Sequence, residues 1–495
     1  MELDRQEPGA GWDARALEVS ERGRARSLLE LLAKAGTDAP AGAAAELLDQ
    51  QRWLEARIEK KIQEQSEART GKQDAVEREL RRLLNEHDQI EHEIRRARPR
   101  YAAHALPQPI REPAIRELLD DETVMLAYAL GEERSFLWVI GRSTTKGHEL
   151  PPRNEIEQRA RAWYELLSDP ARQQSAKGQR ERVAKWLSDV LLRPAAASPG
   201  RRLVVLGDGA LQYLPFAALP APGEPTADPR PLLALHEVLT LPSASVLSVL
   251  RRQLADRPPA PGLLAVVADP VFDARDERFA RPEPRDQDDQ GFDRLPFAGR
   301  EARAILDLAS GGQNLLVDGF DANRERVTGG ELGRYRIVHF ATHGVLDASH
   351  PELSGIVLSG IDERGEPRPG FLRFHEIFNL DLPAELVVLS ACRTALGPQI
   401  RGEGLIGLTR AFFAAGAPRV VVSLWNVEDE ATAGLIERFY RGLLREGLSP
   451  AAALRVAQLA AWREEPWRPY HWAGFVLQGE WRAVDTGAPK SVSAF

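Results

Sequence analysis

The chain has 495 residues, too many for a single hydrophobic core, so two to four domains are expected. Its formal net charge of −8 argues against a general nucleic-acid binder, because neutralising phosphates requires a basic protein face. A single cysteine excludes an internal disulfide framework and a thiolate zinc site, which suits a reducing cytosol.

The first 105 residues are predicted to form a helical arm. The N-terminus has neither the basic nor the apolar region of a signal peptide, and no apolar run of about 18 residues predicts a membrane span. Apolar residues recur at spacings of three and four over 14–36 and again over 47–94, the second stretch being typical of a coiled-coil hairpin. Two interpretations stay open, namely helices that pack on the next domain and an arm that docks a partner.

A proline-containing boundary at 105–113 separates this arm from an α/β pattern. Short apolar runs at 123–130, 135–142, 201–209 and 263–270 alternate with helical stretches, which indicates a mostly parallel sheet. The first two runs flank a "GEER" turn and predict a β-hairpin. We divide the pattern into regions 106–258 and 259–485, followed by a tail at 486–495.

Three local signals in the second region predict a loop and two helix starts. The polar, proline-bearing stretch 271–294 is predicted to be a mobile surface loop. Two helix starts are also predicted, one with Asp321 as N-cap and one at the pair Ser449 and Pro450.

Two strand ends in the second region carry groups suited to acyl transfer. "IVHFATHG" ends with His343 and Gly344, and "LVVLSAC" ends with Cys392. A free thiol has a pKa of about 8.5, so a cysteine nucleophile needs a neighbouring base such as imidazole. The backbone N–H groups of Gly344 and Cys392 could form an oxyanion hole. His339 shares a strand face with His343 and is expected to be a buried, hydrogen-bonded histidine.

Each of these residues also has a structural interpretation. A lone cysteine after an apolar run is often just a small buried hydrophobe. It is the conjunction of a His-Gly strand end with a Cys strand end, 49 residues apart (392 − 343), that favours catalysis. That separation is typical of the caspase order.

Six motifs in this order resemble the CHAT domain, a caspase-like protease domain in the clan of caspases, separases and gingipains. The resemblance covers about 115 to 483. The motifs are "HFATHG" (339–344), "PELSGIVLS" (351–359), "LSACRTA" (389–395), "GEGLIGLTRAFFAAG" (402–416), "VVSLWNVEDEAT" (421–432) and "WAGFVLQG" (472–479).

The resemblance implies a caspase-like three-layer α/β fold with His343 as general base and Cys392 as nucleophile. It further implies that 106–258 is a caspase-like lobe without a dyad, and that 259–485 is the catalytic lobe. The start of the chain resembles the last helix of a tetratricopeptide array, although no repeat of about 34 residues is visible.

Substrate specificity leaves two interpretations of Asp429 open. Many clan members cleave after basic residues with acidic pocket groups, for which Asp429 is the first candidate, ahead of Glu428 and Glu430. Alternatively, Asp429 is the N-cap of a helix beginning at Glu430. Metacaspase-like relatives carry an aspartate two residues before the cysteine, where this chain has Ser390.

The stretch 397–404 follows the predicted nucleophile. It is either a plain loop or a segment processed on activation, with Arg401 as the cut site if cleavage follows a basic residue.

Together these features predict a cytoplasmic cysteine endopeptidase that cleaves a protein substrate. It would need no metal or organic cofactor, would bind neither nucleic acid nor membrane, and would be activated by a protein partner through the N-terminal helices. One alternative is a catalytically silent CHAT-like scaffold or interaction module. Another is a thiol acyltransferase or amidase acting on small amides.

Overall fold

In the computed structural model, the chain is described over 11–35, 110–195, 201–224, 229–255, 257–279, 292–309, 313–345, 354–390 and 403–486, with Arg57, Arg82 and Glu86 besides. Helix α2 (Trp12–Ala35) confirms the first helix of the predicted arm. The predicted hairpin over 47–94 lies outside the described residues apart from those three, which are helical. The first part of α2, residues 110–279 and residues 292–486 belong to one compact unit.

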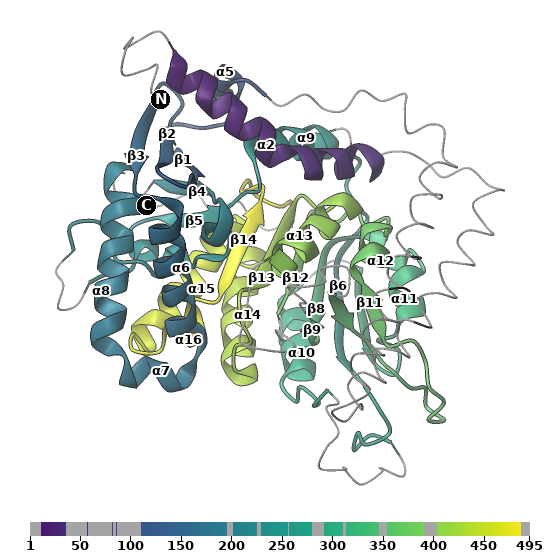
Figure 1. The fold of residues 1–495 in the computed structure, drawn as a ribbon. Coiled ribbons are helices and arrows are strands. Elements are labelled where there is room, and N and C mark those ends of the chain that lie inside the picture. Colours follow the sequence, from purple (N-terminus) through teal and green to yellow (C-terminus); the bar gives the residue numbers. More distant parts are fainter. Residues whose placement is uncertain are drawn as a thin grey trace. The chain divides into compact units, whose positions relative to one another are not determined.

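An 11-stranded sheet runs through this unit in the order β3-β2-β1-β4-β5-β14-β13-β12-β8-β6-β7 (Figure 1). Seven of its ten neighbouring pairs are parallel, which confirms the mostly parallel α/β sheet. The strands are β1 (Thr123–Ala129), β2 (Ser135–Ile140), β3 (Thr145–Leu150), β4 (Arg202–Leu206), β5 (Glu237–Thr240), β6 (Gly262–Pro270), β7 (Asn314–Gly319), β8 (Tyr335–Ala341), β12 (Leu386–Leu389), β13 (Arg419–Ser423) and β14 (Phe475–Gly479).

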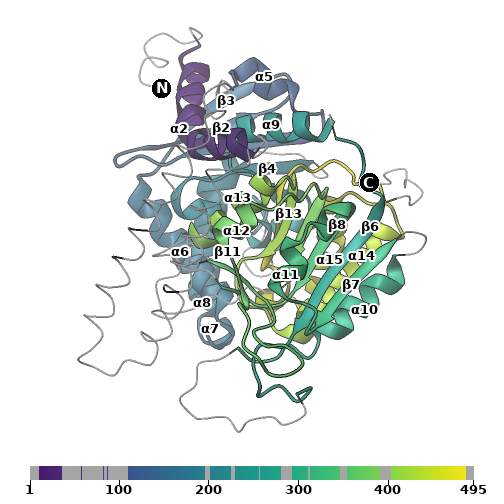
Figure 2. The same cartoon turned by 90° about the vertical axis from the view of Figure 1, so that its right-hand side faces the viewer.

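Helices cover both faces of the second half of the sheet, as the near-continuous apolar strands require (Figure 2). Helices α10 (Ala298–Leu308), α14 (Asp429–Leu444) and α15 (Pro450–Glu464) pack side by side on one face. The opposite face carries α11 (Arg324–Thr328), α12 (Phe374–Phe378) and α13 (Glu403–Ala415). The remaining α-helices among the described residues are α5 (Glu112–Glu117), α6 (Arg153–Ser168), α7 (Pro170–Ser175), α8 (Lys177–Leu187), α9 (Ala244–Ala255) and α16 (Pro469–Trp472).

The strands of regions 106–258 and 259–485 lie on opposite sides of one continuous sheet. The last strand in the chain, β14, joins them, because it pairs with β13 on one side and contacts β5 through Gln478 and Thr240 on the other. Arg251 of α9 reinforces the junction through an ion pair with the buried Glu480, with Nη2 3.2 Å from Oε1. The assignment of each side as a caspase-like lobe stays a prediction.

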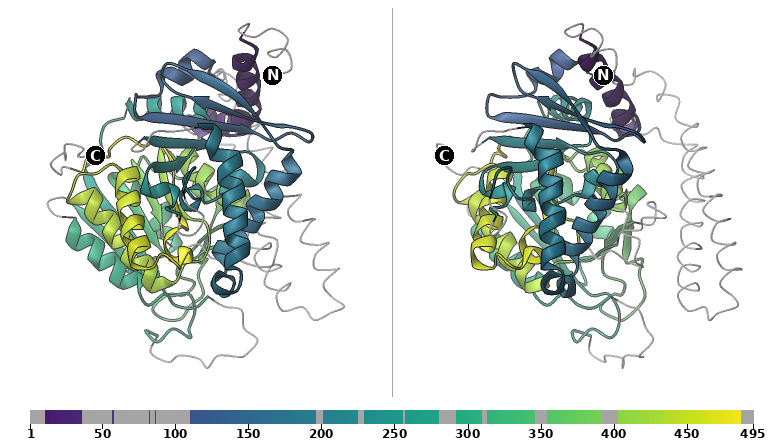
Figure 3. Two further views of the ribbon diagram at one scale, coloured as in Figure 1. Left: turned by 90° about the vertical axis from the view of Figure 1, so that its left-hand side faces the viewer. Right: turned by 60° about the vertical axis from the view of Figure 1, so that its left-hand side comes forward.

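The N-terminal helix is tied to the first half of the sheet, beside α9 (Figure 3). Arg24 donates to the carbonyl oxygen of Leu206 at 2.6 Å and to that of Tyr128, at the carboxyl ends of β4 and β1. Glu21 accepts the N–H of Ser245 at 2.7 Å, in the first turn of α9. These contacts are long-range and at least partly buried, so the first part of α2, which carries them, is an integral part of this unit.

Two of the predicted local features are confirmed. Strands β1 and β2 form the predicted antiparallel hairpin. Ser449 caps α15 by accepting the N–H of Ala452 at 3.3 Å, ahead of Pro450. The N-cap prediction for Asp321 is wrong, because α11 begins at Arg324 and Asn323 accepts the N–H of Arg326 at 3.1 Å.

A second, three-stranded sheet follows β8. It contains β9 (Gly344–Val345), β10 (Gly355–Val357) and β11 (Phe371–Arg373), with β10 in the centre and all pairs antiparallel. Within the parts of the chain that the structure describes, no helix is both long and apolar enough to span a bilayer.

Candidate active site

Strands β8 and β12 are parallel neighbours in the centre of the second half of the sheet. Phe340 pairs with Leu389, and the N–H of Ser390 continues the ladder by donating to the carbonyl oxygen of Phe340 at 3.0 Å. All four residues of β12 are buried. The carboxyl ends of these strands therefore lie next to each other, where open α/β sheets form their sites.

His343 lies just beyond the end of β8 and is 5% exposed. Its Nε2 atom is 2.7 Å from the backbone carbonyl oxygen of Asp293. A carbonyl oxygen can only accept a hydrogen bond, so Nε2 must carry the proton. In the neutral ring this leaves the lone pair on Nδ1, the nitrogen that can accept a proton.

Two aromatic rings fix the plane of this imidazole. The ring centroids of Phe272 and Phe292 lie 5.3 Å and 5.4 Å from that of His343. Because the apolar rings surround it, the imidazole has little freedom to rotate away from the carbonyl oxygen of Asp293.

These contacts correct the prediction of a mobile surface loop over 271–294. Residues 280–291 lie outside the described part, but both flanks pack against the site. The first flank carries Val271, which is fully buried, and Phe272, and the second carries Phe292 and Asp293. The flanks form one wall around His343, which polar composition alone did not reveal.

Gly344 occupies the first position of β9, an edge strand of the small sheet. The N–H of Val357 donates to the carbonyl oxygen of His343 at 2.8 Å, so His343 and Val357 face each other in a hydrogen-bonded register. Facing pairs alternate in an antiparallel ladder, so the next pair, Gly344 and Ile356, is of the non-bonded type. The amide of Gly344 therefore points away from β10, as an oxyanion donor requires.

Cys392 lies outside the described residues, as do Arg401 and most of the predicted processing stretch 397–404. The described residues stop at Ser390, two positions before the cysteine, and resume at Glu403. Ser390 is buried, and its hydroxyl lies 3.3 Å from the carbonyl oxygen of Phe340. Because residue 390 is a serine, no acidic side chain occupies the position at which metacaspase-like relatives carry aspartate.

His339 has the structural role that the sequence predicted. It is fully buried in β8, with its Nε2 atom 2.7 Å from the carboxylate of Glu301 on α10. The ring of Tyr440 packs edge-on against it, with centroids 5.5 Å apart. Glu301 and Tyr440 enclose His339 away from the strand end, so it belongs to the core.

Asp429 is the first residue of α14, and Glu428 occupies the N-cap position. The prediction of Asp429 as N-cap of a helix from Glu430 is therefore wrong. The Asp429 carboxylate instead accepts the N–H of Phe297 at 2.8 Å, at the start of α10. Burial is the main cause that raises the pKa of the Asp429 carboxyl above its usual range. The carboxylates of Glu301 and Asp269 add to this rise.

A carboxyl with a raised pKa destabilises the fold when it ionises. The unfolded chain releases the Asp429 proton at lower pH, so stability falls as pH rises from the unfolded to the folded pKa. We expect Asp429→Asn to raise the melting temperature at pH 7, because the amide oxygen still accepts the Phe297 N–H without a charge. The gain should vanish near pH 3, below the ordinary pKa of about 3.9.

Thermal unfolding between pH 3 and pH 8 checks this, with the exposed Glu430→Gln as the matched control. An Asp429→Asn gain that is absent at pH 7, or equal at both ends of the range, would contradict it.

Phe272, Phe292 and Asp293 are the site residues that sequence reasoning missed. The two phenylalanines were a usable signal, since large aromatic residues in a polar stretch usually pack against something. Asp293 gave none, because it acts through its backbone carbonyl, which every residue type has.

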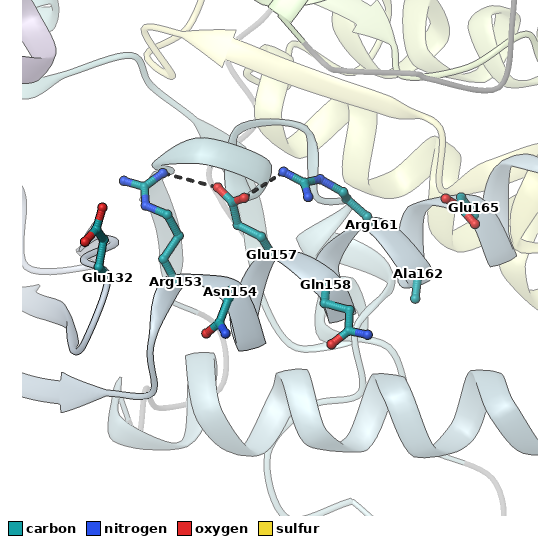
Figure 4. A pocket seen from close by; sticks show the side chains of 8 residues that line it. All are labelled: Glu132, Arg153, Asn154, Glu157, Gln158, Arg161, Ala162 and Glu165. Carbon is teal, nitrogen blue, oxygen red and sulfur yellow. Dashed lines mark hydrogen bonds and ion pairs between the residues drawn. The ribbon is translucent and has the colours of Figure 1, made fainter.

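A hollow of about 640 Å³ lies elsewhere, along α6 in the first half (Figure 4). Glu157 bridges Arg153 and Arg161 across it, at 3.2 Å and 2.6 Å. None of its lining residues comes from β8 or β12, so it belongs to a different part of the molecule. Among the described residues, no group of three or more His, Cys, Asp or Glu side chains could hold a metal ion.

These observations define an α/β protein with a buried, tautomer-selected histidine at the carboxyl edge of a parallel sheet. The CHAT domain matches residues 181–480, more than half of the chain. The chain belongs to the CHAT domain family. The match begins later than the predicted start near 115, and the tetratricopeptide-like interpretation of the first helix stays a prediction.

Two relatives are named tetratricopeptide repeat protein 28. The human protein is 30% identical over 329 residues, and the mouse protein is 29% identical over 330 residues. Each match covers 59% of this chain and 12% of the relative, so this chain corresponds to a small part of their length.

Solved structures show more distant likeness. The separase–securin complex of Saccharomyces cerevisiae superposes with a TM-score of 0.45 at 10% identity, covering 74% of this chain and 30% of that chain. The complex of RgpB pro- and mature domains of Porphyromonas gingivalis gives 0.33 at 9% identity, covering 66% and 76%.

Proposed function

We propose that this protein is a cysteine endopeptidase with His343 as general base and Cys392 as nucleophile. The register of β8 and β12 is the observation that carries the proposal. His343 lies three residues beyond Phe340, and Cys392 lies three residues beyond Leu389, the partner of Phe340. Neighbouring strands are about 4.8 Å apart. Two residues that lie the same number of positions beyond a pair of facing residues are therefore expected to have their side chains close together.

The state of His343 supports the same role. With Nε2–H committed to the carbonyl oxygen of Asp293, Nδ1 is the basic nitrogen. Nδ1 would accept the thiol proton, giving a thiolate beside an imidazolium, and burial among aromatic rings shields this pair from water. The carbonyl oxygen of Asp293 would stabilise the imidazolium that forms.

The reaction would proceed in two halves. The Cys392 thiolate attacks the scissile carbonyl carbon, and the N–H groups of Gly344 and Cys392 receive the oxyanion. The C–N bond then breaks, the amine leaves with the proton from His343, and a thioester remains. Water, deprotonated by His343, cleaves the thioester and restores the thiol.

The finer features stay part of the proposal. If the protein substrate carries a basic residue before the cut, the Asp429 carboxylate would bind that residue. It would do so through Oδ1, because Oδ2 accepts the N–H of Phe297. A protein partner acting on the N-terminal helices would activate the enzyme, and the contacts of Arg24 with the ends of β1 and β4 offer a mechanical link. We place the protein in the cytoplasm, without a cofactor.

A peptide library with mass-spectrometric detection tests the proposed activity. We expect cleavage at discrete sites by the wild type, and none by Cys392→Ala. Cleavage of small amides while polypeptides stay uncleaved would favour the amidase alternative. No turnover of either class by the full chain, even after addition of binding partners of residues 1–105, would refute the enzyme and favour a scaffold.

A further inference from the structure

Asp269, the second-last residue of β6, has a backbone conformation that residues other than glycine rarely adopt, with φ of 47°. The pairing with β7 shifts register between Ala268 and Pro270 at the same point. Such a conformation persists only where the surrounding contacts hold it, and it is most often found at functional sites.

Two arginines hold this carboxylate. Arg294 binds both oxygens, with Nε 3.0 Å from Oδ1 and Nη2 2.9 Å from Oδ2, which is the bidentate geometry of the strongest ion pairs. Arg278 lies 3.1 Å from Oδ2 and donates to the carbonyl oxygens of Asp269 at 2.7 Å and Pro270 at 3.1 Å. The Asp269 side chain is only 11% exposed, so water competes little with these bonds.

The first turn of α10 leaves space for the carboxylate. A Cβ atom at Gly299 would lie 3.2 Å from Oδ2 of Asp269, a distance at which one of the two would have to move. A helix N-terminus also favours a negative charge. Asp269 is thus fitted between two guanidinium groups and the start of α10.

The arginines come from the two flanks that wall the active site. Arg278 follows Phe272 on the first flank, and Arg294 is adjacent to Asp293 on the second. One carboxylate therefore ties together the segments that contact His343 through a phenylalanine ring and a backbone carbonyl oxygen. Adjacent Cα atoms are about 3.8 Å apart, so anchoring Arg294 restricts the Asp293 peptide directly.

We propose that Asp269 and Arg294 are positioning residues that hold the Asp293 carbonyl oxygen against Nε2 of His343 and so select the Nε2–H tautomer. They do not touch the substrate. Without the anchor, the carbonyl oxygen leaves hydrogen-bond geometry, the Nδ1–H tautomer gains population, and less base faces the thiol. The catalytic consequence rests on the proposed function, but the tautomer itself does not.

Two variants test the proposal. Asp269→Asn keeps the size of the side chain, and asparagine tolerates a positive φ, but the bidentate ion pair with Arg294 loses its negative charge. Arg294→Gln removes the guanidinium group from the same ion pair. Selective ¹⁵N labelling of the histidines, with the His343 signal assigned by its loss in His343→Ala, reports the tautomer by its nitrogen shifts.

We expect the wild type to carry the His343 proton on Nε2 and both variants to show a mixture of tautomers. Alkylation of Cys392 at pH 7 should slow about tenfold to a hundredfold, as for a misplacement of about 1 Å. Arg294→Lys, which keeps the charge, should recover part of the rate. Arg368→Gln, which removes an exposed pair with Asp362, is the matched control and should behave as wild type.

Variants that stay folded with a wild-type His343 tautomer would overturn the positioning role. This holds even if the protein is an active protease. Conversely, a tautomer shift in both variants of a chain that cleaves no peptide would uphold the positioning role and refute the proposed function.

Discussion

Replacement of either His343 or Cys392 by alanine is expected to reduce peptide hydrolysis by roughly 10⁴-fold or more, because the two groups act as one unit. The double variant should be no slower than the poorer single variant, for the same reason. Steady-state kcat/KM on a cleaved library peptide measures both effects.

The fold should survive these changes. His343 lies past the end of β8, and the buried pairs of β8 and β12 do not involve it. We therefore expect circular dichroism spectra like those of the wild type. Residual turnover above a hundredth of wild type in a folded single variant would refute the dyad.

Glu301→Ala is expected to lower the free energy of unfolding by about 3 kcal/mol, because it leaves the buried His339 without its carboxylate partner. Glu301→Gln should cost less, since the amide oxygen can still accept from Nε2. Urea unfolding of the variants measures the difference.

Helix α10 also offers the control. Arg303 is exposed on the same helix, and Arg303→Ala should stay within about 0.5 kcal/mol of wild type. A Glu301→Ala loss no larger than that of Arg303→Ala would mean that the pair contributes nothing to stability.

The strands could be predicted because central parallel strands are continuous apolar runs, as in Leu386–Leu389. Their order in the sheet could not. Strand β14 inserts between β5 and β13, and nothing local to Phe475–Gly479 encodes which distant edges it pairs with. Helix starts were predicted less well, because several polar residues near Asn323 and Asp429 could each have been the N-cap.

The site was predicted as far as residue types reveal chemistry. A histidine and a cysteine at strand ends are recognisable, whereas the carbonyl oxygen of Asp293 is not. The positive φ of Asp269 and its two arginines depend on contacts across a polar segment that has no hydrophobic period. Such features arise from tertiary structure alone.

Alkylation of Cys392 by iodoacetamide as a function of pH tests the dyad most directly. Cys392 is the only cysteine, so the labelled thiol is unambiguous. We predict a reaction midpoint well below about 8.5 in the wild type and a return towards that value in His343→Ala. A midpoint near 8.5 in both proteins would contradict the dyad, because His343 would then not activate the thiol.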